Sequence, residues 1–255
     1  MATEKLLIGH IPSIFNALHL FVAANTIIIY NIHYFIKSIP AGISDRADWS
    51  AKHPAMHPVL ILVGIIISGI CIFFLPWRVI GISVALGLLS LGYSLPILPF
   101  PQKKRLKDWG LLKLFLLALV WTCVTVLMPV IYWEKQLHAY EAEFLLRFIF
   151  MLPLCIGFDI RDMETDKTHQ IYTLPNAIGL KSSRRLTDLF LLIFCLVAYW
   201  QYTRYPFPDR LISAFVIALL TKLVLQLSKK VNTDFFYLLF VDGMMLAYAM
   251  VIIFL

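Results

Sequence analysis

The sequence predicts an all-α membrane protein, a polytopic bundle of about eight spanning helices. Its 255 residues are 60% hydrophobic, with a mean hydropathy of +0.82. A spanning helix needs about 20 mainly apolar residues, so this composition fills seven or eight spans. The apolar residues also run continuously, as in 59–67, instead of alternating as they do in a transmembrane barrel. These observations exclude a soluble enzyme and a secreted binding module.

Polar and Pro-rich segments divide the apolar sequence into its expected helices. In chain order the helices cover residues 11–36, 59–75, 77–96, 111–132, 143–158, 186–203, 210–228 and 234–254. The first is too long for the core of a signal peptide and is therefore interpreted as a spanning helix. No soluble segment or short-period repeat interrupts the series, so residues 1–255 are expected to form one membrane domain.

The connections between these helices alternate in length, which places the long ones on one face. Long polar segments, 37–58, 97–110 and 159–185, end the first, third and fifth helices. The loops of that face carry 14 of the 22 Lys and Arg residues, against 5 on the opposite face. Basic loops stay in the cytoplasm, so this face is expected to be cytoplasmic, with both termini outside. The same asymmetry explains the net charge of +7 without a nucleic-acid partner.

The candidate site with the clearest chemistry is an acidic segment after the fifth helix. Asp159, Asp162 and Asp166 follow one another at i, i+3 and i+7, so a continuing helix would place all three carboxylates on one face. Mg2+ binds one or two carboxylates and completes its shell with water and phosphate oxygens. The pattern therefore indicates a metal site that binds a diphosphate. The alternative is a solvated acidic turn that pairs with Arg161 and Lys167.

The sequence around and after these aspartates resembles a known family. The run from Asp159 to Gly179, which includes Thr173-Leu174-Pro175, is similar to the second aspartate-rich motif and the following Thr-Leu-Pro segment of the UbiA-type intramembrane prenyltransferase superfamily. Tyr93-Ser94 and the basic loop after it fit the same family. Its members are helical bundles that use Mg2+ to transfer a polyprenyl group from its diphosphate to a small or aromatic acceptor.

The resemblance implies a role for each matching residue. Asp159, Asp162 and Asp166 would be the catalytic residues and would hold Mg2+. The diphosphate would be bound by polar and basic side chains, namely Asn31, Tyr93, Lys103, Lys104, Arg105, Arg161 and Lys167. The expected partners are a polyprenyl diphosphate, a lipid or aromatic acceptor and membrane lipid. For each lysine of the basic loop, a role as a topology anchor is an equal alternative.

One family motif is incomplete in this sequence. The first motif, NxxxDxxxD, aligns with Asn31, Phe35 and Ile39, so apolar side chains stand where both aspartates are expected. Neither can bind a metal, and the second motif would have to hold it alone. His33 or Asn25 offers a further polar contact, although a membrane His or Asn more often joins two helices by a hydrogen bond.

Charged residues inside the expected helices need partners, because a charge at membrane depth is costly. Lys222 and Asp242 lie at similar depths in the last two helices, which are expected to be antiparallel neighbours, so we expect them to pair. Arg147 lies near a helix end and is expected to snorkel toward the interface.

Several function classes agree with these patterns. The aspartates, Tyr-Ser and the basic loop together favour Mg2+-dependent prenyl transfer, and a terpene cyclase on the same fold would use the same residues. Loss of the first-motif aspartates favours a non-catalytic subunit that binds lipid or a protein partner. A transporter would show inverted repeats and helices broken at the midplane, and the sequence shows neither clearly.

Overall fold

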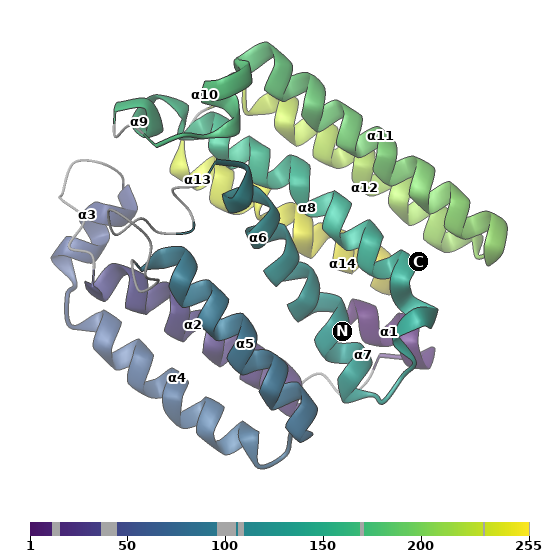
Figure 1. The fold of residues 1–255 in the computed structure, drawn as a ribbon, viewed down its shortest axis with the longest axis horizontal. Helices are drawn as coiled ribbons and strands as arrows, with labels where there is room; N and C mark the ends of the chain where they lie inside the picture. Colours follow the sequence, from purple (N-terminus) through teal and green to yellow (C-terminus); the bar gives the residue numbers. More distant parts are fainter. Residues whose placement is uncertain are drawn as a thin grey trace. The chain divides into compact units, whose positions relative to one another are not determined.

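The computed structural model describes residues 1–11, 16–36, 45–95, 106, 110–168, 171–231 and 233–254. Within these ranges the chain is helical and contains no β-sheet. It divides into two compact units, one made of Met1–Ile11 and Leu106–Leu255, the other of Pro12–Arg105. We call them unit 1 and unit 2 and describe each separately (Figure 1).

Unit 2 consists of the helices from α2 to α5, namely α2 (Ala17–Ile36), α3 (Asp45–Lys52), α4 (Met56–Ile72) and α5 (Trp77–Ser94). Unit 1 contains the short α1 (Ala2–Ile8) and the helices that follow Leu106. These are α6 (Gly110–Thr122), α7 (Met128–Tyr132), α8 (Glu141–Arg161), α9 (Met163–Thr168), α10 (Leu174–Ile178), α11 (Leu180–Arg204), α12 (Pro208–Leu227), α13 (Asp234–Phe236) and α14 (Gly243–Phe254). Single π-helical turns, Cys123–Leu127 and Tyr237–Val241, join α6 to α7 and α13 to α14.

The all-α fold class is confirmed, and each of the eight expected segments contains a helix. Two boundaries differ from expectation. The first long helix begins at Ala17 instead of residue 11, and residues before it form α1. The sixth begins at Leu180, directly after Gly179, whose φ of 81° reverses the chain without a Cβ clash. The basic residues of that region therefore lie on α11 rather than in a loop.

Hydrogen bonds from two side chains hold α1 within unit 1. Pro129, which has no backbone N–H, follows a π-helical turn in which the Met128 N–H bonds to the Cys123 carbonyl oxygen, five residues earlier. The Thr3 hydroxyl donates to the Thr125 carbonyl oxygen of that turn at 2.6 Å. Lys5 Nζ then reaches the carbonyl oxygens of Ile252 and Ile253, at 3.0 Å each, and caps the end of α14.

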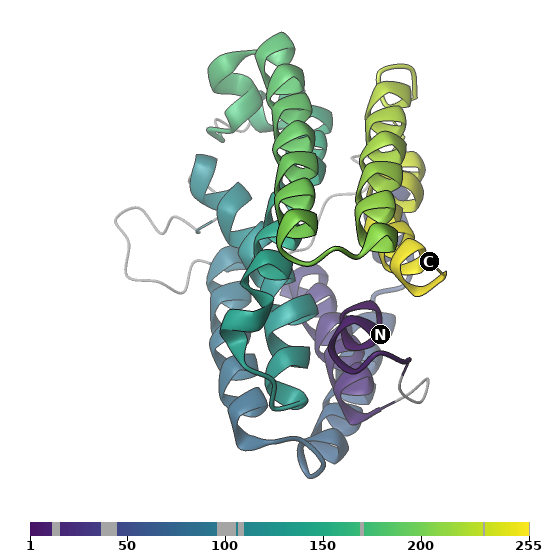
Figure 2. The same ribbon diagram turned by 90° about the vertical axis from the view of Figure 1, so that its right-hand side faces the viewer.

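The core of unit 1 is built around α8, which packs against α6 and α11, while α12 packs against α14 (Figure 2). Aromatic rings from three helices meet at its centre. The Phe150 ring lies 5.5 Å from that of Phe194 and 4.9 Å from that of Tyr248, measured between centroids. All three side chains are at most 3% exposed, so α8, α11 and α14 share one close-packed layer.

Arg147 does not snorkel, and that expectation is wrong. Its Nε lies 3.0 Å from Glu143 Oε1, one helical turn earlier on α8, and its guanidinium lies 4.1 Å above the Tyr248 ring. Both charged residues are at most 7% exposed. The i, i+4 carboxylate and the aromatic face stabilise the cation inside the unit.

In unit 2, α2 and α4 pack against each other through small and polar residues. A Cβ on Gly64 would lie 2.7 Å from Ile28 Cγ1 and 3.1 Å from the Ala24 carbonyl oxygen, so only glycine permits this approach. Asn25 Nδ2 donates to Ser68 Oγ at 2.9 Å across the same interface. Asn25 therefore has the helix-joining role that is usual for a polar residue in a membrane helix.

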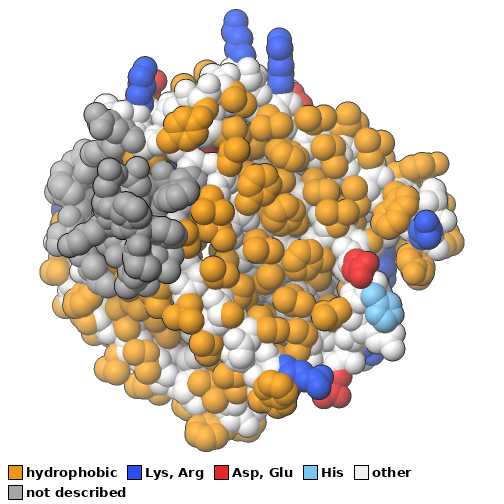
Figure 3. All heavy atoms as spheres, viewed as in Figure 1, with side chains coloured by type: hydrophobic (Ala, Val, Ile, Leu, Met, Phe, Trp, Pro, Cys, Tyr) orange, Lys and Arg blue, Asp and Glu red, His pale blue; other side chains and the backbone are white. Residues whose placement is uncertain are grey.

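The exterior carries many large apolar side chains (Figure 3). Phe73, Trp77 and Phe254 are 87%, 77% and 76% exposed. Among the residues that the structure describes, four helical segments are long and apolar enough to cross a membrane, namely 110–132, 180–204, 208–227 and 234–254, and shorter apolar helices occur in unit 2. Such an exterior suits lipid rather than water, so the chain is an integral membrane protein.

The role of Thr3 is testable in the detergent-purified protein. Replacing it by valine removes the hydroxyl that donates to the part-buried Thr125 carbonyl oxygen, so Thr3→Val should lower the free energy of unfolding by about 1 to 2 kcal/mol. Thermal unfolding measures the change. Thr26→Val is the matched control, since the Thr26 hydroxyl bonds to Val22 within its own helix. Equal stabilities of the Thr3→Val variant and the control would contradict the account.

Candidate functional site

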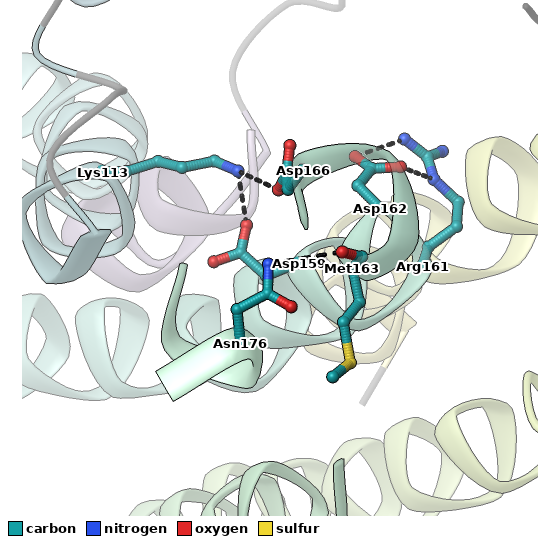
Figure 4. A network of polar contacts seen from close by, with 7 residues as sticks. All are labelled: Lys113, Asp159, Arg161, Asp162, Met163, Asp166 and Asn176. Atoms are coloured by element: carbon teal, nitrogen blue, oxygen red, sulfur yellow. Dashed lines mark hydrogen bonds and ion pairs between the residues drawn. The ribbon is translucent and has the colours of Figure 1, made fainter. Parts of the chain in front are cut away.

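The acidic segment lies where α8 ends and α9 begins. Asp159 is in the last turn of α8 and is 3% exposed. The helix stops at Arg161, Asp162 caps it, and the Asp166 N–H donates to the Asp162 carbonyl oxygen at 2.8 Å in the next short helix. The expected continuous helix is therefore interrupted at Asp162, and this break turns the middle carboxylate away from the other two (Figure 4).

Two of the three aspartates face a lysine from α6. Lys113 Nζ lies 2.6 Å from Asp159 Oδ1 and 3.7 Å from Asp166 Oδ2. Both the Lys113 ammonium and the Asp159 carboxylate are largely removed from solvent, at 18% and 4% side-chain exposure. The lysine therefore compensates part of the negative charge that this buried pair of carboxylates creates.

A glycine lets α6 begin beside the segment that follows the acidic turn. A Cβ on Gly110 would lie 2.6 Å from Tyr172 Cδ1 and 3.2 Å from the Tyr172 carbonyl oxygen. This close backbone approach places Lys113, three residues later, at the carboxylates. The sequence analysis assigned no role to Lys113. It could have been found, because a single charged residue in an apolar helix is costly unless it has a partner.

Asp162 pairs with Arg161. The Arg161 Nε and Nη2 donate to the two Asp162 carboxylate oxygens at 2.7 and 3.0 Å, and Nη1 lies 3.5 Å from Asp234 Oδ1. The guanidinium also lies 5.0 Å from the Phe158 ring centroid and 5.3 Å from that of Tyr237. These contacts tie the end of α8 to the start of the α13 segment.

The Thr-Leu-Pro segment contributes further oxygen atoms to this end of unit 1. Asn176 on α10 lies beside Asp159 in Figure 4, and its Nδ2 donates to the Met163 carbonyl oxygen at 3.3 Å. Among the described residues, the buried oxygens without a hydrogen-bond partner include Asp159 Oδ2, Thr173 Oγ1 and Asn176 Oδ1. Buried oxygens of this kind are uncommon, and they mark the acidic turn and α10 as a place where a ligand or water can bind.

The other expected site residues lie elsewhere or outside the described ranges. Lys167 is exposed on α9. Asn31 and Tyr93 belong to unit 2, where Asn31 bonds to His57 and to its own helix and Tyr93 is half-buried in the last turn of α5. The basic loop residues Lys103, Lys104 and Arg105, like Ile39 of the first motif, fall outside the described residues. Phe35 is 58% exposed.

The expected pairing of Lys222 with Asp242 is wrong. Lys222 on α12 instead forms an ion pair with Asp188 on α11. The two residues lie at similar distances from the short connection between α11 and α12, since Asp188 is 16 residues before Arg204 and Lys222 is 14 residues after Pro208. Asp188 had not been considered as a partner.

The described residues contain no group of three or more His, Cys, Asp or Glu side chains that could hold a metal. Asp159 and Asp166 are two carboxylates that face the same lysine there. That number suits Mg2+, which usually keeps several water ligands and shares substrate phosphates.

These features define a helical membrane protein with a buried, oxygen-rich acidic site at the end of its central helix. The UbiA prenyltransferase family model matches residues 55–250, which extend through parts of both units. The chain therefore belongs to the UbiA prenyltransferase family. No curated protein matches the sequence.

Solved structures support the same fold. The structure of a UbiA homolog from Archaeoglobus fulgidus bound to Cd2+ has a TM-score of 0.64 and 12% identity, and the match covers 100% of this chain and 94% of that one. A second structure of a UbiA homolog from the same organism gives a TM-score of 0.64 and 11% identity with the same coverage. At these identities the likeness establishes the fold alone.

The Lys113 ion pair makes a stability prediction. Lys113→Met leaves Asp159 as an uncompensated buried charge, so it should lower the free energy of unfolding by about 3 kcal/mol. Adding Asp159→Asn removes that charge and should recover part of the loss. Lys167→Met, at an exposed lysine of α9, should change stability by less than about 0.5 kcal/mol. Thermal unfolding of the wild type and these three variants tests this, and a Lys113→Met variant as stable as wild type would contradict the pairing.

Proposed function

We propose that the protein binds a polyprenyl diphosphate at the acidic turn of unit 1 and transfers the isoprenoid group to a lipid or aromatic acceptor, with Mg2+ as cofactor. The observation that carries this proposal is the buried Asp159 carboxylate beside Asp166 and Lys113. Family membership and the UbiA-like fold support the general class.

The donor atoms suit a hard cation. Asp159 Oδ2 is buried and has no hydrogen-bond partner within the described ranges, and the neighbouring buried atoms of Thr173 and Asn176 are also oxygens. Oxygen ligands are those that Mg2+ prefers. Asp159 and Asp166 would hold the ion, with phosphate oxygens and water completing its shell. Bound there, Mg2+ would stabilise the negative charge of the departing diphosphate.

The protein's own residues support the same reaction in three ways. Lys113, next to the carboxylates, offers a second positive charge to the diphosphate as its bond to the prenyl carbon breaks. Arg161 holds Asp162 through two hydrogen bonds and so acts as a positioning residue for the turn. Asn176 ties α10 to α9, which keeps the buried oxygens at one place.

The charge distribution supports a cytoplasmic location for this site. Lys181, Arg184 and Arg185 lie on the first two turns of α11, directly after the acidic turn and α10. Lys229 and Lys230 follow the end of α12. The start of α11 and the end of α12 lie on the same side of this helix pair, because a short connection joins the other two ends. Basic residues gathered on one side are typical of the cytoplasmic face. In this orientation both termini lie outside.

A non-catalytic function is the second candidate, and a specific observation favours it. The Lys113 ammonium already bridges Asp159 and Asp166, and Phe35 stands where the first family motif has an aspartate. A bundle with this internal ion pair could bind lipid or a protein partner without a metal.

Metal-dependent substrate binding separates these candidates. The purified protein should bind tritiated farnesyl diphosphate in Mg2+ and not in EDTA, since Asp159 and Asp166 would hold a metal that offsets the charge of the phosphates. Asp159→Asn and Asp166→Asn should weaken binding at least about tenfold, or 1.4 kcal/mol. Glu164→Gln is the matched control, because Glu164 is an exposed acid on the same short helix as Asp166.

The result also distinguishes the reaction types. Release of diphosphate without any added acceptor would indicate a cyclase, whereas release that requires an acceptor would indicate transfer. Absence of metal-dependent binding by a folded protein would contradict the proposal and favour the non-catalytic subunit.

A further inference from the structure

A hydrogen-bonded chain of three side chains in unit 2 has no place in the function proposed above. Ser50 Oγ lies 2.7 Å from His57 Nε2, and His57 Nδ1 lies 2.8 Å from Asn31 Oδ1. The three residues come from α3, α4 and α2, and His57 is 5% exposed. The sequence analysis assigned Asn31 to the first family motif and to diphosphate binding, and it gave no role to Ser50 or His57.

The direction of each hydrogen bond follows from the asparagine. Asn31 Nδ2 donates to the Ile27 carbonyl oxygen at 2.8 Å, which fixes the amide so that its oxygen faces His57. An amide oxygen only accepts, so His57 Nδ1 carries the proton in this bond. In the neutral imidazole Nε2 then has the free lone pair, and the Ser50 hydroxyl is the donor to it.

This arrangement has the geometry of an activated nucleophile. A serine hydroxyl donates to an imidazole base, and a third group orients the base through its other nitrogen.

The geometry points to a second reactive site in unit 2, in which Ser50 is the nucleophile, His57 the general base and Asn31 the positioning residue, acting on a lipophilic acyl ester. The substrate class follows from the surroundings. Trp49, next to Ser50, is 47% exposed, and Met56 and Val59 at the start of α4 are 41% and 53% exposed. An exposed Trp beside apolar side chains is typical of the membrane interface, where lipid esters reside. The inference does not depend on the proposed prenyl transfer.

The reaction balances with these groups alone. Ser50 Oγ attacks the ester carbonyl carbon while its proton moves to His57 Nε2. The bond between the acyl carbon and the alcohol oxygen breaks, and the departing alkoxide takes the proton from His57. Ser50 is left acylated and the alcohol is released. Water then hydrolyses the acyl serine by the same route, which returns the hydroxyl.

A fluorophosphonate carrying a fluorescent reporter tests the nucleophile in the full-length, detergent-purified protein. Ser50 Oγ would displace fluoride from phosphorus, and peptide mass spectrometry would identify the labelled residue. We expect labelling at Ser50 that is abolished by Ser50→Ala. His57→Gln should slow labelling about 100-fold, the lower end of the effect of general-base catalysis.

Two further variants separate orientation of the base from mere packing. Asn31→Asp keeps the acceptor oxygen and should retain the labelling rate within about threefold, whereas Asn31→Leu removes it and should lower the rate at least about tenfold. Ser83→Ala is the matched control, because the Ser83 hydroxyl bonds only to the Val79 carbonyl of its own helix among the contacts described. Unlabelled wild-type protein that remains folded, or equal labelling in Ser50→Ala, would overturn the inference.

Discussion

The ion pair between Lys113 and Asp159 is the interaction on which the candidate site depends. Two aspartates near the end of an apolar helix would repel each other in a medium of low dielectric constant. The ammonium of α6, 2.6 Å from Asp159 and 3.7 Å from Asp166, offsets that repulsion. Because it comes from a different helix, it also fixes α6 against the end of α8. The same contact therefore contributes to stability and determines which carboxylates face each other.

The need for backbone carbonyls to find hydrogen-bond donors imposes a second constraint on unit 1. In lipid a carbonyl that loses its helical donor has no water to replace it. The π-helical turn Cys123–Leu127 before Pro129 interrupts the regular helical bonds, and the Thr3 hydroxyl donates to the Thr125 carbonyl oxygen of that turn. The end of α14 presents unpaired carbonyls in the same way, and Lys5 binds two of them. The short α1 is therefore part of the bundle, although its seven residues are too few to span a membrane.

The helical architecture could be predicted from hydropathy because apolar runs and Pro-rich breaks are local features of the chain. The three site carboxylates could be found in the same way. The sequence could not predict that Asp159 and Asp166 face Lys113 while Asp162 pairs with Arg161. This difference depends on where α8 ends and on Arg161, which also lies near Asp234. The partner of Lys222 was mispredicted for a similar reason, because its pairing with Asp188 depends on how α12 packs against α11. Pairings between helices require the register of both, which one sequence does not contain.

The central claim is that Asp159 and Asp166 hold a divalent ion that contacts a diphosphate. Electron–nuclear double resonance on the protein with Mn2+ in place of Mg2+ and inorganic diphosphate as ligand tests it most directly. The account predicts a 31P hyperfine coupling that shows a metal-bound phosphate, and its loss in Asp159→Asn but not in Glu164→Gln. A coupling that persists unchanged in Asp159→Asn, or no protein-bound Mn2+ in the folded wild type, would contradict it.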